Sequence, residues 1–135
     1  MKKLIVLLLF IGSMFSAAAL AQHFWRGELM PIDQIKKMWG TTKFDKSFFK
    51  NGSIPDRAKM SYDLIQSKIY VGKSRIEVIN DLGPSDGYYF SGMVPAYLLN
   101  DPKTVGSDLW QLAFLLNSEG LIVEVVVHKN CCDKK

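Results

Sequence analysis

Cysteine is scarce in this chain of 135 residues, which carries only Cys131 and Cys132. Because the two are adjacent, a bridge between them closes a strained ring and cannot staple distant parts of a core. Three states stay open for this pair in the C-terminal tail, residues 131–135: a vicinal disulfide, a link to another chain, or two free thiols. A redox function would need the spacing C-x-x-C or a lowered thiol pKa, and the sequence shows neither.

Histidine is equally scarce, which limits metal binding and catalysis. His23 and His128 are not spaced as H-x-x-x-H or H-E-x-x-H, and no serine stands in G-x-S-x-G. We therefore expect no metal site, no cofactor and no enzyme. The alternative is a small enzyme in which His128 works with loop carboxylates. The loop carboxylates in question are Asp86, Asp101 and Asp108, although aspartate in loops usually caps turns.

No charge of one sign dominates the chain. It has 17 Lys and Arg against 13 Asp and Glu, a net charge of +4, and the basic residues are scattered. Nucleic-acid binding requires a clustered basic surface, so we expect no nucleic-acid partner. Residues 72–74 (Gly-Lys-Ser) match the last three positions of the phosphate-binding motif G-x-x-x-x-G-K-[ST]. The first glycine of that motif would stand at position 67, which is Ser67, so we expect no phosphate-binding loop.

Long apolar runs are lacking apart from residues 4–11 (LIVLLLFI). This run follows Met-Lys-Lys and precedes the small residues around Ala21, a pattern typical of a bacterial signal peptide. It is far shorter than the ~20 residues of a membrane-spanning helix. We predict a signal peptide at residues 1–21, cleavage after Ala21, and a periplasmic or secreted protein. Gln22 stands where a lipoprotein needs cysteine, so we expect no lipid anchor.

Two segments with different patterns follow the predicted leader. Residues 22–52 predict an N-terminal arm, with a short helix at 31–40 and a linker at 41–52. We expect the linker's Phe48 and Phe49 to anchor it to the core.

Residues 53–130 predict a globular domain that begins with a helix at 53–66. The clearest signal is a second helix at residues 74–83. Ser74 and Glu77 form a capping box, in which each side chain satisfies a backbone N–H at the start of the helix.

The hydrophobic period changes to two after Pro84, and this predicts strands. Because helices precede a run of strands, we predict an α+β fold, with two to three short helices packed on one face of a three- to four-stranded antiparallel sheet. The expected strands cover residues 88–90, 93–99, 109–116 and 121–128.

Aromatic residues in these strands are the main candidates for a binding site. One face of the sheet must pack on the helices, and an open second face would present an aromatic surface of the kind that protein partners bind. Alternatively, the N-terminal arm or the linker residues Phe48 and Phe49 pack on these aromatic residues and cover them. The candidate partner-binding residues are Tyr88, Tyr89, Tyr97 and Trp110.

The capped helix and the strands that follow it also resemble a known family. The matching pattern is G-K-S-x-x-E-V-I-x-x-L-G-P-S-D, then D-L-W-x-L-x-F-L-L-N-x-E-G-L-I-V-E-V-V-V. It is similar to the SmpA/OmlA (BamE) outer-membrane assembly proteins and to small exported proteins with a β-lactamase-inhibitor-protein-like fold, over residues 69–128. The matching residues are Gly72, Lys73, Ser74, Glu77, Val78, Leu82, Gly83, Pro84, Asp86, Trp110, Phe114, Gly120 and Val123.

The resemblance implies an α+β fold and a non-enzymatic role in protein contacts. Two departures separate this chain from the assembly lipoproteins: the missing anchoring cysteine, and a long section at residues 22–68 that the pattern does not cover. We expect an exported module that binds another protein of the cell envelope or exterior. An inhibitor or immunity-type protein against a hydrolase or toxin is an alternative that the fold resemblance implies.

Overall fold

The computed structural model describes residues 27–101 and 109–129. The predicted signal peptide, Asp108 and the cysteine pair lie outside the described residues. The chain forms helices α2 to α5 and strands β1 to β4. In chain order these are β1 Glu28–Leu29, α2 Ile32–Trp39, α3 Lys46–Asn51, α4 Ile54–Ser67, α5 Arg75–Leu82, β2 Ala96–Leu98, β3 Trp110–Leu116 and β4 Ile122–Lys129.

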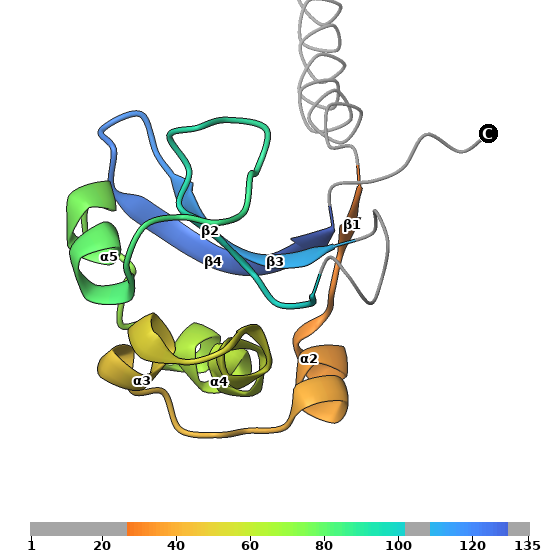
Figure 1. The fold of residues 1–135 in the computed structure, drawn as a ribbon. Helices are drawn as coiled ribbons and strands as arrows, with labels where there is room; N and C mark the ends of the chain where they lie inside the picture. Colours follow the sequence, from red (N-terminus) through yellow and green to blue (C-terminus); the bar gives the residue numbers. More distant parts are fainter. Residues whose placement is uncertain (1–26, 102–108, 130–135) are drawn as a thin grey trace, which may run out of the picture.

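The predicted α+β fold is confirmed: helices pack on a four-stranded antiparallel sheet with strand order β1-β4-β3-β2 (Figure 1). The helices α2, α3 and α4 lie on one side of the sheet. The described residues contain four helices, one more than the upper limit of the prediction. None of these helices has the length and apolar character that crossing a membrane requires.

The main core lies between the sheet and the helices. Phe49, Tyr70, Tyr97 and Phe114 are almost fully buried there and meet edge to face, with ring centroids 5.5 to 5.8 Å apart. Such edge-to-face pairs are favoured by the aromatic quadrupole. Residues 28–52, grouped above as an N-terminal arm, contribute β1, α2 and α3 to this arrangement.

The linker at residues 41–52 contains a helix that the sequence pattern did not predict. The Asp45 carboxylate accepts a hydrogen bond from the Phe48 N–H (2.7 Å) and caps α3. Phe49 is buried in the core, as expected of an anchor, whereas Phe48 is 52% exposed. Six residues are too few for a stable isolated helix, so burial of Phe49 holds α3 in place.

Helices α4 and α5 both begin with a capping box. Ser74 and Glu77 form the expected capping box at α5, and Ser53 with Asp56 forms a second one at α4. Gly83 follows α5 at φ 88°, a conformation that favours glycine.

Two predicted strands differ from the structure. Residues 88–90 form no strand and belong to a loop. The strand predicted at residues 93–99 is reduced to β2, Ala96–Leu98, which begins after Pro95 because proline has no N–H for a ladder. The predicted hairpin at the end of the chain is present as β3 and β4, with a register shift opposite Leu115 and Leu116.

Candidate protein-binding surface

The second face of the sheet is covered by the segment between α5 and β2, which we name the aromatic loop (residues 84–95). In Figure 1 this segment passes on the side of the sheet opposite α2, α3 and α4. Its Tyr89 is only 6% exposed and forms a small second core with Ala96 and Ala113 of the sheet. The second face is therefore packed against the chain itself and not left open.

Gln111 of β3 fastens the aromatic loop to the sheet. Its side chain is buried, its Oε1 accepts a hydrogen bond from the Tyr88 N–H (2.9 Å), and its Nε2 donates to the Tyr88 carbonyl (2.7 Å). The Gly87 N–H donates to the Ala96 carbonyl (2.9 Å) beside this contact. The Gln111 side-chain amide therefore bonds the Tyr88 N–H and C=O in the way that the backbone of a neighbouring strand would.

His128 lies directly opposite Gln111 in the β3–β4 ladder. It is 1% exposed, and its ring meets those of Tyr89 and Phe90 edge to face at 4.9 and 5.6 Å. The alternative that joined His128 to loop carboxylates finds no support at Asp86. The Asp86 carboxylate accepts hydrogen bonds from the Arg57 guanidinium (2.5 Å) and from the Leu98 N–H (2.9 Å). Leu98 lies on β2 and His128 on β4, with β3 between them, so the backbones of these two residues are about 10 Å apart.

Apolar side chains emerge around the buried Gln111–His128 pair. Tyr88 is 60% exposed, Phe90 46%, Met93 63%, and Leu29 52%. Leu29 is the direct partner of His128 across β1 and β4, so it shares the face that the loop covers. Phe90 adopts φ 50°, the left-handed region, which costs roughly 1–3 kcal/mol for a bulky residue and persists only where the surroundings fix it.

The four aromatic candidates of the sequence do not share one surface. Tyr88 is exposed on the aromatic loop, while Tyr89 next to it points into the second core. Burial and the Glu124 carboxylate raise the pKa of Tyr89 to about 12. Adjacent side chains of an extended segment point to opposite sides, so Tyr88 faces outward when Tyr89 faces the sheet.

Tyr97, one of the candidate partner-binding residues, does not lie at the surface. Tyr97 is fully buried on the helix side, and its O–H donates to the Gly83 carbonyl (2.7 Å) at the end of α5. Burial and the Asp86 charge raise its pKa. Trp110 also packs on the helix-side core, half-buried, with the Lys129 ammonium 4.9 Å from its ring centroid. Strand register places both residues on the helix side. Tyr97 pairs with Leu112, which faces the helices, and Trp110 stands two residues before Leu112 on the same face of β3.

The sequence pattern missed Leu29 and Met93 as surface residues. Leu29 lies in a segment without a clear period, and Met93 was assigned to a strand. A useful signal was available in residues 91–92 (Ser-Gly), which interrupt the strand pattern and place the neighbouring apolar residues in a loop.

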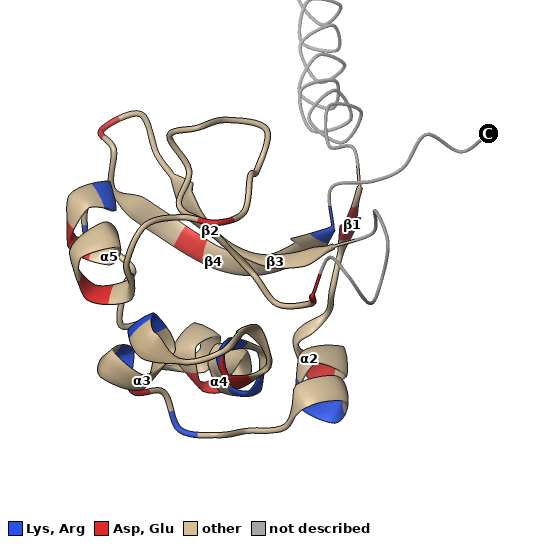
Figure 2. Ribbon diagram, in the orientation of Figure 1, with Lys and Arg blue, Asp and Glu red and all other residues tan. Residues whose placement is uncertain are grey.

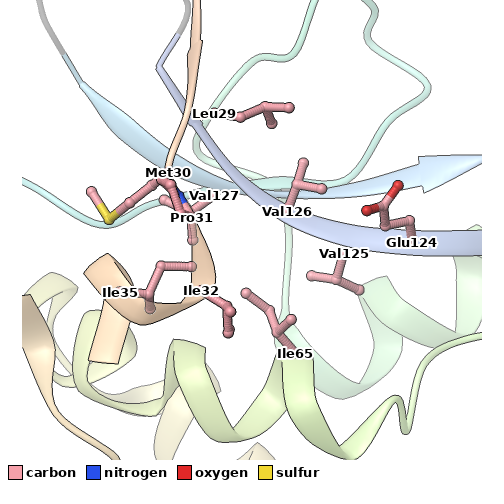
Figure 3. A pocket seen from close by; sticks show the side chains of 10 residues that line it. All are labelled: Leu29, Met30, Pro31, Ile32, Ile35, Ile65, Glu124, Val125, Val126 and Val127. Atoms are coloured by element: carbon pink, nitrogen blue, oxygen red, sulfur yellow. The ribbon is translucent and has the colours of Figure 1, made fainter. Parts of the chain in front are cut away.

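A second surface feature lies along the outer edge of β4. One cavity of about 280 Å³ is lined by the ten residues of Figure 3, from β1, the start of α2, α4 and β4. A neighbouring cavity of about 360 Å³ is lined by Ile65, Lys68, Val71 and residues 123–125. The two share Ile65, Glu124 and Val125, and together we name them the β4-edge groove.

Charged residues are dispersed over the described part of the chain. Figure 2 shows acidic and basic residues interspersed over the helices, with Glu124 in the middle of β4. Within residues 27–101 and 109–129, no group of three or more His, Cys, Asp or Glu side chains could hold a metal ion.

No family model, curated protein or solved structure matches this chain in the three comparisons with known proteins. The resemblance to the SmpA/OmlA family therefore stays an expectation from its sequence pattern.

Proposed function

We propose that this chain is an exported binding module that contacts another protein of the cell envelope through the aromatic loop. The observation that carries the proposal is the pairing of exposed apolar side chains with a rigid support. Tyr88 and Phe90 project from a loop whose backbone Gln111 holds by two hydrogen bonds. The predicted leader at residues 1–21 supports the envelope as the compartment.

Rigid aromatic side chains suit a binding surface for a physical reason. Tyrosine and phenylalanine bury much area on binding and lose little conformational entropy, so they concentrate binding energy at interfaces. The fixed backbone at Tyr88 and Phe90 removes the further cost of ordering a loop. Leu29 extends the apolar surface from the loop onto β1.

Site-specific photo-crosslinking in cells that export the chain tests this proposal. A benzoylphenylalanine at position 88 or 90 is expected to trap the same envelope protein. The matched control is position 76, since Ile76 is 66% exposed on α5 and lies outside the loop. Equal crosslinking at position 76, or none at positions 88 and 90, would contradict the proposal.

A further inference from the structure

The outer edge of β4, on the side away from β3, carries backbone groups that no strand among the described residues pairs. The Phe114 N–H donates to the Pro95 carbonyl and the Trp110 carbonyl accepts from the Leu99 N–H, so this set of β3 residues bonds toward β2. The alternate β3 residues bond toward β4, where their partners are Glu124, Val126 and His128. Val125 and Val127 must therefore direct their N–H and C=O groups to the outer edge.

The two ends of this edge are closed by the chain itself. The Met30 N–H donates to the Val127 carbonyl (2.9 Å) at one end. At the other end Ile122 exchanges hydrogen bonds with Gly72 and Lys73 (2.7 and 2.8 Å). Among the described residues, none bonds the Val125 N–H or C=O on this side.

The chain leaves the edge of β4 directly after Met30. Pro31 is the N-cap of α2, and its carbonyl accepts hydrogen bonds from the Gln34 and Ile35 N–H groups, so the residues that follow turn into the helix and do not continue along the opening. The opening from Ile122 to Val127 is about 17 Å long, room for roughly four extended residues.

The β4-edge groove supplies apolar walls beside these free backbone groups. In Figure 3, Ile32, Ile35 and Ile65 lie below β4 on the helix side, while Leu29 and Val126 lie above it. A strand added to β4 would place its side chains alternately into these two sets. Glu124 is exposed on the upper side and forms no ion pair with any described residue.

We propose that the β4-edge groove binds a short extended segment of a partner polypeptide as an added antiparallel strand. The residue opposite Val125 is apolar and β-branched, because its side chain shares the helix side with Val125 and meets Ile65. The next residue, opposite Glu124, is lysine or arginine, whose charge complements the unpaired carboxylate. The preceding residue, opposite Val126, is apolar.

A second copy of this chain does not fit as the occupant. The strand position next to β4 is already filled at both ends by β1 and residues 72–73. The β4 edge of a second copy is recessed in the same way, so the two edges cannot meet. A single extended peptide is narrow enough to enter the opening between β1 and residues 72–73, whereas the edge of another sheet is not. This inference shares Leu29 with the surface around the aromatic loop, but it rests on the backbone of β4 and does not depend on the loop.

Amide hydrogen exchange on the full exported chain tests the open edge first. Val125 is expected to exchange faster than Glu124 and Val126, whose N–H groups pair with β3. Strong protection of Val125 in the dilute free protein would overturn the inference. Protection that grows with protein concentration would assign the edge to a second copy instead.

A defined peptide then tests the occupant. The probe is acetyl-Gly-Val-Ile-Lys-Gly-amide, with Ile opposite Val125 and Lys opposite Glu124. We expect weak binding, roughly 0.1–1 mM, and slower exchange at Val125. Methylation of the Ile nitrogen removes a hydrogen bond to β4 and should weaken binding about tenfold. Methylation of the Lys nitrogen, which faces away from β4, is the control and should change binding less than about twofold.

Charge exchange tests the predicted neighbour of Glu124. Glu124→Lys should weaken binding of the Lys peptide roughly threefold to tenfold and favour the same peptide with Glu in place of Lys. Glu119→Lys, the same change at an exposed turn residue outside the groove, is the matched control. Equal effects of the two variants, equal effects of the two methylations, or no peptide binding would each overturn the proposal.

Discussion

Gln111 and Tyr88 are joined by a pair of hydrogen bonds in which a buried side-chain amide pairs with a loop backbone, at 2.9 and 2.7 Å. The amide offers one acceptor and one donor in the spacing of a neighbouring strand, so a segment that forms no strand is still held against the sheet. This contact fixes the backbone at Tyr88, and ring contacts with Tyr89 and His128 position Phe90.

Removal of this amide should loosen the loop. Gln111→Ala leaves the Tyr88 N–H and C=O without their partner and should lower the free energy of unfolding by about 1–3 kcal/mol. Urea denaturation measures the change. Gln66→Ala, at an exposed position of α4, should stay within about 0.5 kcal/mol of the parent. Similar losses in both variants would show that Gln111 has no special part in stability.

The tight fit of the loop should show at Gly87. A Cβ at this position would lie 2.6 Å from Gln111 Oε1 and 3.2 Å from the Ala96 backbone, so Gly87→Ala must displace the contact. We expect a loss of roughly 1–3 kcal/mol in thermal or urea unfolding. At Gly92 a Cβ meets nothing within 4 Å, and Gly92→Ala should be neutral or slightly stabilising. A harmless Gly87→Ala change would contradict the described packing.

The buried Tyr97 hydroxyl should be worth about 1–2 kcal/mol, because Tyr97→Phe leaves the Gly83 carbonyl without its 2.7 Å donor. The measurement is again the free energy of unfolding. Tyr62→Phe is the matched control, since Tyr62 is only half-buried and should change stability little. If the two substitutions have the same effect, the Tyr97 hydroxyl does not hold the end of α5.

Alkaline pH should weaken the fold through the buried tyrosines. The pKa of Tyr89 is raised to about 12 by burial and by the Glu124 carboxylate, and burial raises the pKa of Tyr70 and Tyr97 as well. A raised tyrosine pKa means that the folded state favours the neutral phenol. The contribution of Tyr89 to the free energy of unfolding is therefore fully present below pH 10, the ordinary tyrosine pKa, and is lost as the pH rises toward 12.

Urea unfolding at pH 9 and pH 11.5, with phenolate absorbance as a second readout, measures this loss. Tyr89→Phe should reduce the pH dependence in that window. The exposed Tyr88→Phe substitution is the control and should leave it nearly unchanged. If Tyr89→Phe leaves the pH dependence unchanged, Tyr89 does not contribute to the loss of stability at alkaline pH.

The sequence by itself determined the features that depend on neighbours in the chain. Ser74 and Glu77 are three residues apart, so their capping box follows from local geometry and marks α5 correctly. The alternation of β3 and β4 around a short turn likewise indicates their hairpin, and helices before strands indicate the α+β class.

The tertiary structure decided which face each aromatic residue takes. A period of two shows that strand residues alternate, but only the register with distant strands places Tyr97 and Trp110 on the helix side. Residues 88–90 have the composition of a strand, yet they form a loop, which Gln111, 23 residues from Tyr88, holds by two hydrogen bonds to the Tyr88 backbone. Contacts of this kind join residues far apart in the chain, and a single sequence carries no local signal for them.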